Sequence, residues 1–151
     1  MTTQKAKLTW DAVKVGDKLP SYKRSETQED IDNYTKLNEH PASGGGIPGF
    51  NLHSDTNIEG GGIFKGTVNY GVVTVAFMTE LLTNHFPVHA VTHGSINMRA
   101  MEPIRPLDVV TYSGEVTGKR TEGAKRIVEV DITGKNQLDQ TVAVAKATVV
   151  L

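Results

Sequence analysis

The sequence predicts an α+β fold in which an antiparallel sheet wraps around one long helix. Two observations predict it. Apolar side chains cover nearly the whole circumference of a helix over residues 69–86, which indicates a helix buried on most sides. In residues 126–134, valine and isoleucine alternate with charged or polar residues, the period-two pattern of a half-buried strand. A buried helix followed by such strands is typical of the α+β class.

Two elements are expected before the long helix. Residues 8–24 combine short apolar runs with a Gly-Asp turn, and we expect an entry strand with turns there. A helix follows, which begins with a weak capping box at Thr27 and ends before Pro41. Three carboxylates at its start are expected to form a solvated face that suits the helix dipole: Glu26, Glu29 and Asp30.

Residues 39–66 are expected to form a long glycine-rich loop inserted between the two helices. Its glycines include Gly44-Gly45-Gly46 and Gly60-Gly61-Gly62, and no Gly-Lys-Ser/Thr sequence follows them. They therefore favour a loop conformation over phosphate binding. Loops of this length are usually functional or mobile, so candidate site residues are sought here.

Strands are expected after the long helix. The period-two pattern is clearest in the third of them, and a proline-rich break from Pro103 to Pro106 separates the first two. The expected strands span residues 89–101, 108–119, 126–134 and 141–151.

Length and composition exclude several classes of function. The 151 residues, 38% hydrophobic and 22% charged, suit one globular domain over residues 1–151. A formal net charge of −1 argues against nucleic acid or a membrane surface as partner. The absence of cysteine excludes disulfides and thiolate chemistry. Residues 1–10 lack the apolar core of a secretory signal and no stretch is long enough to span a membrane, so we expect a cytoplasmic location.

The first candidate functional residue is His53, on the loop before the long helix. An imidazole can give or take a proton near neutral pH. Gly71 follows at the expected first turn of the helix, whose free N–H groups can stabilise an oxyanion. The alternatives are a surface histidine without a role and a glycine chosen for close packing. The interval between the two favours acid/base chemistry on a carbonyl.

Other motifs give weaker signals. His89 and His93 would share one face of the strand expected there, but no carboxylate stands at an obvious third-ligand position. No metal site is therefore expected. No serine lies in a Gly-x-Ser-x-Gly elbow, which disfavours a serine hydrolase.

The order of these pieces resembles the MaoC-like hydratases and dehydratases. That family has a Gly-Asp entry turn, a short helix with a tyrosine, an Asn-Pro-aliphatic-His-x-Asp motif and a long helix that opens with His-Gly. Arg-Pro-Gly-Asp and Asn-Gln-x-Gly follow on its strands. The matching pieces are Val15-Gly16-Asp17, Tyr34, Asn51-Leu52-His53-Ser54-Asp55, Tyr70-Gly71, Arg105-Pro106-Leu107-Asp108 and Asn136-Gln137.

The resemblance implies a hot-dog fold and hydration of an enoyl thioester, or the reverse dehydration. By analogy His53 would be the acid/base group, and the N–H of Gly71 would stabilise the enolate-like oxygen. The substrate would be a thioester of CoA or of a carrier protein. The resemblance implies a homodimer and no cofactor beyond the carrier in the substrate.

The chain departs from the family pattern beside the histidine. The family's Asp lies five residues before the His, where this chain has Pro48; counted from Tyr34, its position falls at His40, next to Glu39. Tyr70 replaces the helix-opening His. Either Glu39 or His40 supplies the second catalytic group, or Asp55 does, or His53 acts alone.

Other candidates follow from the neighbourhood of the motif. Three residues that flank His53 are expected to contact the substrate: Phe50, Asn51 and Asp55. The hydroxyl of Tyr70 and the glycine-rich loop suit an acyl group that is bulky, cyclic or oxygen-bearing. Two further functions stay open. One is a catalytically silent subunit that binds an acyl thioester, and the other is an isomerase or cyclase on a natural-product or aromatic intermediate.

Overall fold

The computed structural model describes residues 8–37, 51–54, 64 and 66–151. Most of the glycine-rich loop expected over residues 39–66 lies outside these ranges. Four candidate site residues also lie outside the described residues: Glu39, His40, Phe50 and Asp55.

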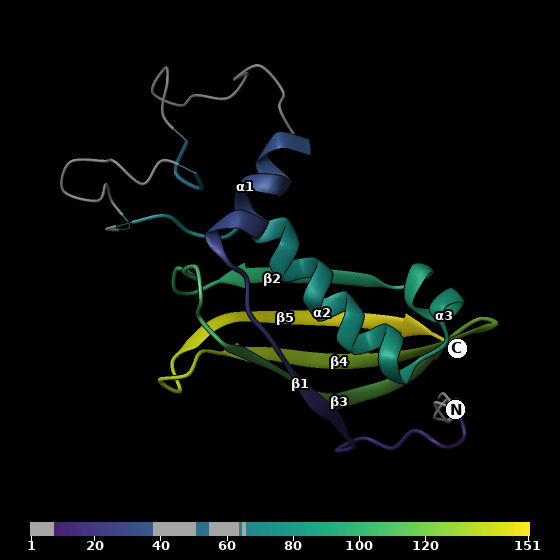
Figure 1. The fold of residues 1–151 in the computed structure, drawn as a ribbon. Coiled ribbons are helices and arrows are strands. Elements are labelled where there is room, and N and C mark those ends of the chain that lie inside the picture. The colour runs from purple at the N-terminus through teal and green to yellow at the C-terminus, as the bar shows by residue number, and fades with distance from the viewer. Residues whose placement is uncertain (1–7, 38–50, 55–63, 65) are drawn as a thin grey trace, which may run out of the picture.

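Five antiparallel strands form one sheet in the order β1-β3-β4-β5-β2, and the long helix α2 lies across one face of it (Figure 1). This arrangement confirms the predicted hot-dog class of fold. The strands are β1 (Lys18–Arg24), β2 (Ser95–Ala100), β3 (Val110–Glu122), β4 (Lys125–Lys135) and β5 (Thr141–Val150). The helices are α1 (Gln28–Leu37), α2 (Gly71–His85) and α3 (Val88–Thr92). None of the described helices is long and apolar enough to cross a membrane.

The core lies between α2 and the face of the sheet that this helix covers. The alternation predicted for β4 is present: Val128, Val130 and Ile132 are buried, whereas the residues between them are half-buried. They belong to the same apolar cluster as Met78 and Leu81 of α2. Burial of these side chains holds the helix across the sheet and so fixes where its first turn lies.

The prediction that α2 is buried on most sides is wrong for the single chain. Its buried residues, Thr74, Met78, Leu81 and Leu82, face the sheet. Val72 remains 56% exposed, and Val73 and Val75 are half-buried. The physical reason is that a single sheet covers only one face of a helix, so apolar composition overstates burial.

The strand expected over residues 89–101 is wrong in its first part. Residues Val88–Thr92 form α3, and β2 begins only at Ser95. The carbonyl of Pro87 accepts hydrogen bonds from the N–H groups of Ala90 and Val91, which starts a helical turn. The helix ends before Gly94, where only glycine fits against β5, because a Cβ there would lie 1.9 Å from the carbonyl oxygen of Thr148.

His89 and His93 consequently do not share a strand face. The Nδ1 of His93 bonds the carbonyl of His89 at 2.6 Å, one helical turn back. Within the described ranges, no three histidine or carboxylate side chains come together in a way that would hold a metal ion.

Candidate functional site

His53 is held on a short turn that packs against α1. Its backbone N–H donates to the side-chain oxygen Oδ1 of Asn51 at 2.9 Å. Its carbonyl accepts a hydrogen bond from Nε2 of Gln28, also at 2.9 Å. The Asn51 oxygen is thus committed to the backbone of His53, and Asn51 fixes the position of the histidine.

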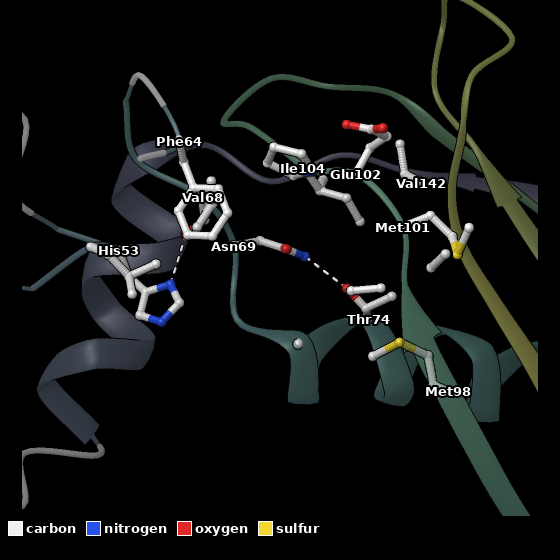
Figure 2. A pocket seen from close by; sticks show the side chains of 15 residues that line it. His53, Phe64, Val68, Asn69, Thr74, Met98, Met101, Glu102, Ile104 and Val142 are labelled. Carbon is white, nitrogen blue, oxygen red and sulfur yellow. Dashed lines mark hydrogen bonds between the residues drawn. The ribbon is translucent and has the colours of Figure 1, made fainter. Parts of the chain in front are cut away.

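The imidazole of His53 is oriented by the strand-like segment before α2. Its Nδ1 lies 2.9 Å from the carbonyl oxygen of Val68 (Figure 2). Because a carbonyl can only accept, Nδ1 carries the hydrogen in this contact. In the neutral ring the other nitrogen, Nε2, then has a free lone pair and can accept a proton.

Tyr70 supports this imidazole from one side. The two rings are stacked with their centroids 3.6 Å apart and their planes inclined by 23°. The Tyr70 hydroxyl lies 2.8 Å from Oγ1 of Thr35, which also bonds Ser54. Tyr34 packs its ring against Tyr70 at 4.8 Å. The ring of Tyr70 therefore supports His53, while its hydroxyl is bound to α1.

Gly71 opens α2, as predicted. The side chain of Tyr70, at the N-cap, makes no capping hydrogen bond. The N–H groups of Val73 and Thr74 donate to the carbonyl of Tyr70, whereas those of Gly71 and Val72 have no acceptor within the described helix, and the helix dipole gives this end partial positive charge. The first turn can therefore donate to an anionic oxygen.

His53 and Gly71 border the same cavity of about 360 Å³ (Figure 2). Most of its lining is apolar, from Leu52, Phe64, Val68, Met98, Ala100, Met101, Pro103, Ile104, Val142 and Ala143. Four side chains add polar groups: His53, Asn69, Thr74 and Glu102. An apolar cavity with few polar groups suits a small, mostly apolar ligand whose orientation those groups fix.

A buried polar network behind this cavity was missed by the sequence reasoning. The amide nitrogen Nδ2 of Asn69 donates to Thr74 Oγ1 at 3.0 Å and to Glu26 Oε2 at 3.2 Å. Glu26 is half-buried, so the expectation of a solvated face is wrong for this carboxylate; Glu29 and Asp30 are exposed as predicted. The carbonyl of Glu26 accepts a hydrogen bond from the N–H of Leu107 at 2.7 Å, which holds this segment against the turn before β3.

Burial raises the pKa of Glu26 above its ordinary value. The hydrogen bond from Asn69 opposes this shift, and the charge of Asp30 adds to it. Burial also raises the pKa of Tyr112, whose hydroxyl lies near Glu26 and Thr74. No periodicity marks these residues; the one available signal was the polar Asn69 just before a strongly apolar helix.

The structure brings together three of the predicted site residues: His53, Tyr70 and Gly71. Asn51 lies beside them as the support of His53. Among the residues that the structure describes, no carboxylate is hydrogen-bonded to the His53 imidazole, which contacts the Val68 carbonyl and the Tyr70 ring.

Solved structures share this arrangement of helix and sheet. The MaoC-like dehydratase from Rhodospirillum rubrum superposes with a TM-score of 0.73 at 20% identity, over 95% of this chain and 96% of that one. The (R)-hydratase from A. caviae, involved in PHA biosynthesis, superposes with a TM-score of 0.70 at 20% identity, over 91% of this chain and 96% of that one. A chain of the ChsH1-ChsH2 complex from Mycobacterium tuberculosis superposes with a TM-score of 0.67 at 21% identity, over 91% of this chain and 97% of that one.

These similarities define the fold. The chain has the hot-dog fold of the MaoC-like dehydratases and R-hydratases, which confirms the resemblance at the level of structure. No protein-family model matches the sequence, and the search of curated proteins found no match either.

Proposed function

We propose that this chain is a lyase of the MaoC-like family, a hydratase or dehydratase of an enoyl or 3-hydroxyacyl thioester. One observation carries the proposal. The bond from Nδ1 of His53 to the Val68 carbonyl leaves Nε2 as a proton acceptor on an apolar cavity that the first turn of α2 also borders. A base and an oxyanion donor in one cavity are the two groups that reversible hydration requires.

Hydration then adds the water oxygen to C3 and a proton to C2. His53 Nε2 takes a proton from water as the water oxygen bonds to C3 of the enoyl group. The electrons of the double bond move toward the thioester oxygen, where the N–H of Gly71 stabilises the negative charge. The imidazolium returns its proton to C2, which regenerates neutral His53. This chemistry calls for no cofactor besides the CoA or carrier protein of the substrate.

The lining supports a thioester with a short or compact acyl group. Apolar side chains from β2, β5 and the segment around Ile104 surround the space next to His53. A cavity of about 360 Å³ is at the lower end of the range for small-molecule sites, so a cyclic or branched acyl group fits better than a long chain.

A panel of enoyl-CoA thioesters with linear, branched and cyclic acyl groups tests the function. The proposal predicts that the purified chain consumes at least one of them and that mass spectrometry finds the mass of one added water. A product of unchanged mass would instead indicate an isomerase or cyclase. Hydration by the single purified chain would exclude the silent alternative.

A silent acyl-thioester-binding subunit is the second candidate. One observation favours it: within the described ranges no carboxylate reaches His53, whereas water held by two partners is the usual requirement for hydration. One similar structure is a complex of two named proteins, ChsH1 and ChsH2. This alternative predicts thioester binding without turnover, and recovery of activity only with a second hot-dog chain.

We also propose that the chain forms a homodimer. The face of α2 turned away from the sheet is apolar, with Val72 and Ala76 exposed. Among the described strands, β2 lies at the edge of the sheet and pairs with β5 alone. An apolar helix face near an unpaired strand edge is a surface that soluble proteins usually cover. The cytoplasmic location stays a prediction from the sequence.

A further inference from the structure

Asn69 is a buried polar residue on the wall of the cavity, two residues before α2. Only 9% of its surface is exposed. Its backbone N–H donates to the carbonyl of Ile104 at 2.9 Å, which fixes the main chain. Figure 2 shows its side chain extending from the His53 side of the cavity toward Thr74.

The amide of Asn69 is held in one orientation. Its Nδ2 has two hydrogens, and the acceptors are Glu26 Oε2 at 3.2 Å and Thr74 Oγ1 at 3.0 Å. A flipped amide would place its oxygen against the Glu26 carboxylate, where two acceptors face each other without a hydrogen. Ionised Glu26 therefore selects the orientation in which Oδ1 is left over.

The remaining oxygen, Oδ1, accepts no hydrogen bond from a described residue. Among the described residues, every fully buried polar atom of a side chain has a hydrogen-bond partner, so the unpaired Oδ1 is not fully buried. Oδ1 is therefore accessible from the cavity that Asn69 lines. The neighbouring lining is apolar, from residues such as Val68 and Ile104. Once an acyl chain displaces water from this space, an unpaired acceptor is costly unless the ligand donates to it.

We propose that Asn69 determines specificity at this site by accepting, through Oδ1, a hydrogen bond from the oxygen atom on C3 of the acyl thioester. The assignment rests on the proposed function, because that function supplies the acyl thioester. Glu26 is the positioning residue, since it acts on the substrate only through the Asn69 amide.

The same contact serves both directions of the reaction. During hydration, the attacking water gives one hydrogen to His53 Nε2 and donates the other to Asn69 Oδ1. When the C3–O bond has formed, that second hydrogen is the hydrogen of the 3-hydroxyl group, still bonded to Oδ1. Asn69 thus gives the water its second partner, the part that a carboxylate plays in the family pattern.

Binding of a matched pair of thioesters tests this assignment. The pair is 3-hydroxybutyryl-CoA and butyryl-CoA, which differ only by the hydroxyl group. Titration calorimetry is done on the His53→Ala protein, so that the hydroxyl compound is not dehydrated. We expect about 10-fold tighter binding of the hydroxyl compound, because a site built around a hydroxyl rejects the analogue that lacks it. In Asn69→Leu on the same background, the two affinities should agree within about twofold.

Thr67→Val is the matched control. Thr67 is also a buried polar residue just before α2, but its hydroxyl donates to Gln28 Oε1 and it does not line the cavity. The control should keep the preference for the hydroxyl compound. Circular dichroism of each variant establishes that the fold is retained.

Glu26→Gln tests the positioning role by a pH profile. Among the described residues, Asp30 and Tyr112 are the titratable groups that interact with Glu26, and His53 is absent from the test protein. In the His53→Ala protein that retains Glu26, the preference for the hydroxyl compound should fall as acid protonates this carboxylate. A protonated Glu26 can donate to Oδ1 of a flipped Asn69 amide, so it no longer selects one orientation. In Glu26→Gln the preference should be smaller than in the protein with Glu26 and the same at every pH, because a neutral carboxamide can either accept from Asn69 Nδ2 or donate to Oδ1. A purely structural Glu26 would lower both affinities equally and leave their ratio flat with pH.

The outcomes separate this inference from the proposed function. A hydroxyl preference that depends on Asn69, in a wild-type protein that turns over no enoyl thioester, supports the inference and refutes the lyase. Turnover with equal binding of the two thioesters, or a preference unchanged in Asn69→Leu, overturns the inference and keeps the lyase. Failure of both thioesters to bind overturns the inference, since it assigns Oδ1 to an acyl thioester.

Discussion

The ring of Tyr70 is stacked on the imidazole of His53, with 3.6 Å between the centroids, and its hydroxyl is bonded to Thr35 on α1. Tyr70, which stands where the family pattern has the helix-opening histidine, thus supports the imidazole of His53 through its aromatic ring. This relationship ties the geometry of His53 to the first helix.

Two substitutions of Tyr70 separate its ring from its hydroxyl. Tyr70→Phe keeps the stack and loses the bond to Thr35, so kcat should change by less than about threefold, with a stability loss of roughly 0.5–1.5 kcal/mol. Tyr70→Ala removes the support of His53, and kcat should fall by about 10-fold or more, since small misplacements of a catalytic group are costly. Steady-state kinetics on the best enoyl thioester and thermal denaturation measure both. Equal kcat values for the two variants would refute the supporting role.

Gly71 allows its backbone donor to be removed without breaking the helix. Gly71 is the first residue of α2, where proline is tolerated, and Tyr70 before it has φ −78° and ψ 132°, as a residue before proline requires. Gly71→Pro should therefore fold and lose the N–H, with a fall in kcat of about 10²–10³-fold, as for the loss of one oxyanion donor.

Gly71→Ala is the control for that experiment. It retains the N–H, and an added Cβ would meet only Met98 at 3.8 Å, an ordinary contact. Its kcat should stay within a few-fold of the wild type. A Gly71→Pro protein that folds and turns over as fast as Gly71→Ala would exclude Gly71 as the oxyanion donor.

Glu26 gives a pH dependence of stability. Because burial raises its pKa in the folded state, the fold binds the Glu26 proton more tightly than the unfolded chain does. The contribution of Glu26 is favourable below its ordinary pKa of 4.5 and is lost as the pH rises through the raised folded value. Glu26→Gln removes this charge and keeps an acceptor for Asn69. Its melting temperature relative to the wild type should rise over that interval and then level off.

The size of that difference is limited. Glu26 is only half-buried and solvent screens its charge, so we expect no more than about 2–4 °C, or ~1 kcal/mol for a domain of this size. Thermal melts of both proteins from pH 4 upward measure it. A difference that shrinks as the pH rises would contradict the sign.

The exposed face of α2 predicts the effect of charge on assembly. Val72→Glu together with Ala76→Glu places two carboxylates on this apolar face, and burying them in an interface would be costly. The pair should shift the protein from dimer to monomer in analytical ultracentrifugation at micromolar concentration. Val15→Glu, at a residue 61% exposed on a turn before β1, is the control and should leave the dimer unchanged. A wild-type monomer would contradict the dimer proposal itself.

The fold could be predicted where one period dominates the sequence. The alternation around Val130 predicted β4, and the long apolar run predicted α2. The hydrophobic pattern predicted a strand over residues 89–92, where the structure has a helix. Pro87 starts a single helical turn there that is too short to show a pattern of its own. The hydrophobic pattern also overstated the burial of α2, since a sequence pattern does not tell a covered apolar face from one left exposed.

The site could be predicted only where its chemistry is local. His53 and Gly71 were found because a motif and a helix start mark them. The Val68 carbonyl that orients His53 is a backbone group with no sequence signal. Glu26 and Asn69 lie 43 residues apart in the chain, and the backbone of each is hydrogen-bonded to the segment from Ile104 to Leu107, a tertiary contact that no local pattern reveals.

The central claim is that His53 carries the proton in a thioester reaction. The most direct measurement is kcat/KM of His53→Ala beside the wild type on the best enoyl-CoA of the panel, with circular dichroism to establish that both are folded. The account predicts a fall of about 10²-fold or more, the usual contribution of general acid–base catalysis. An unchanged kcat/KM in the folded variant would contradict it.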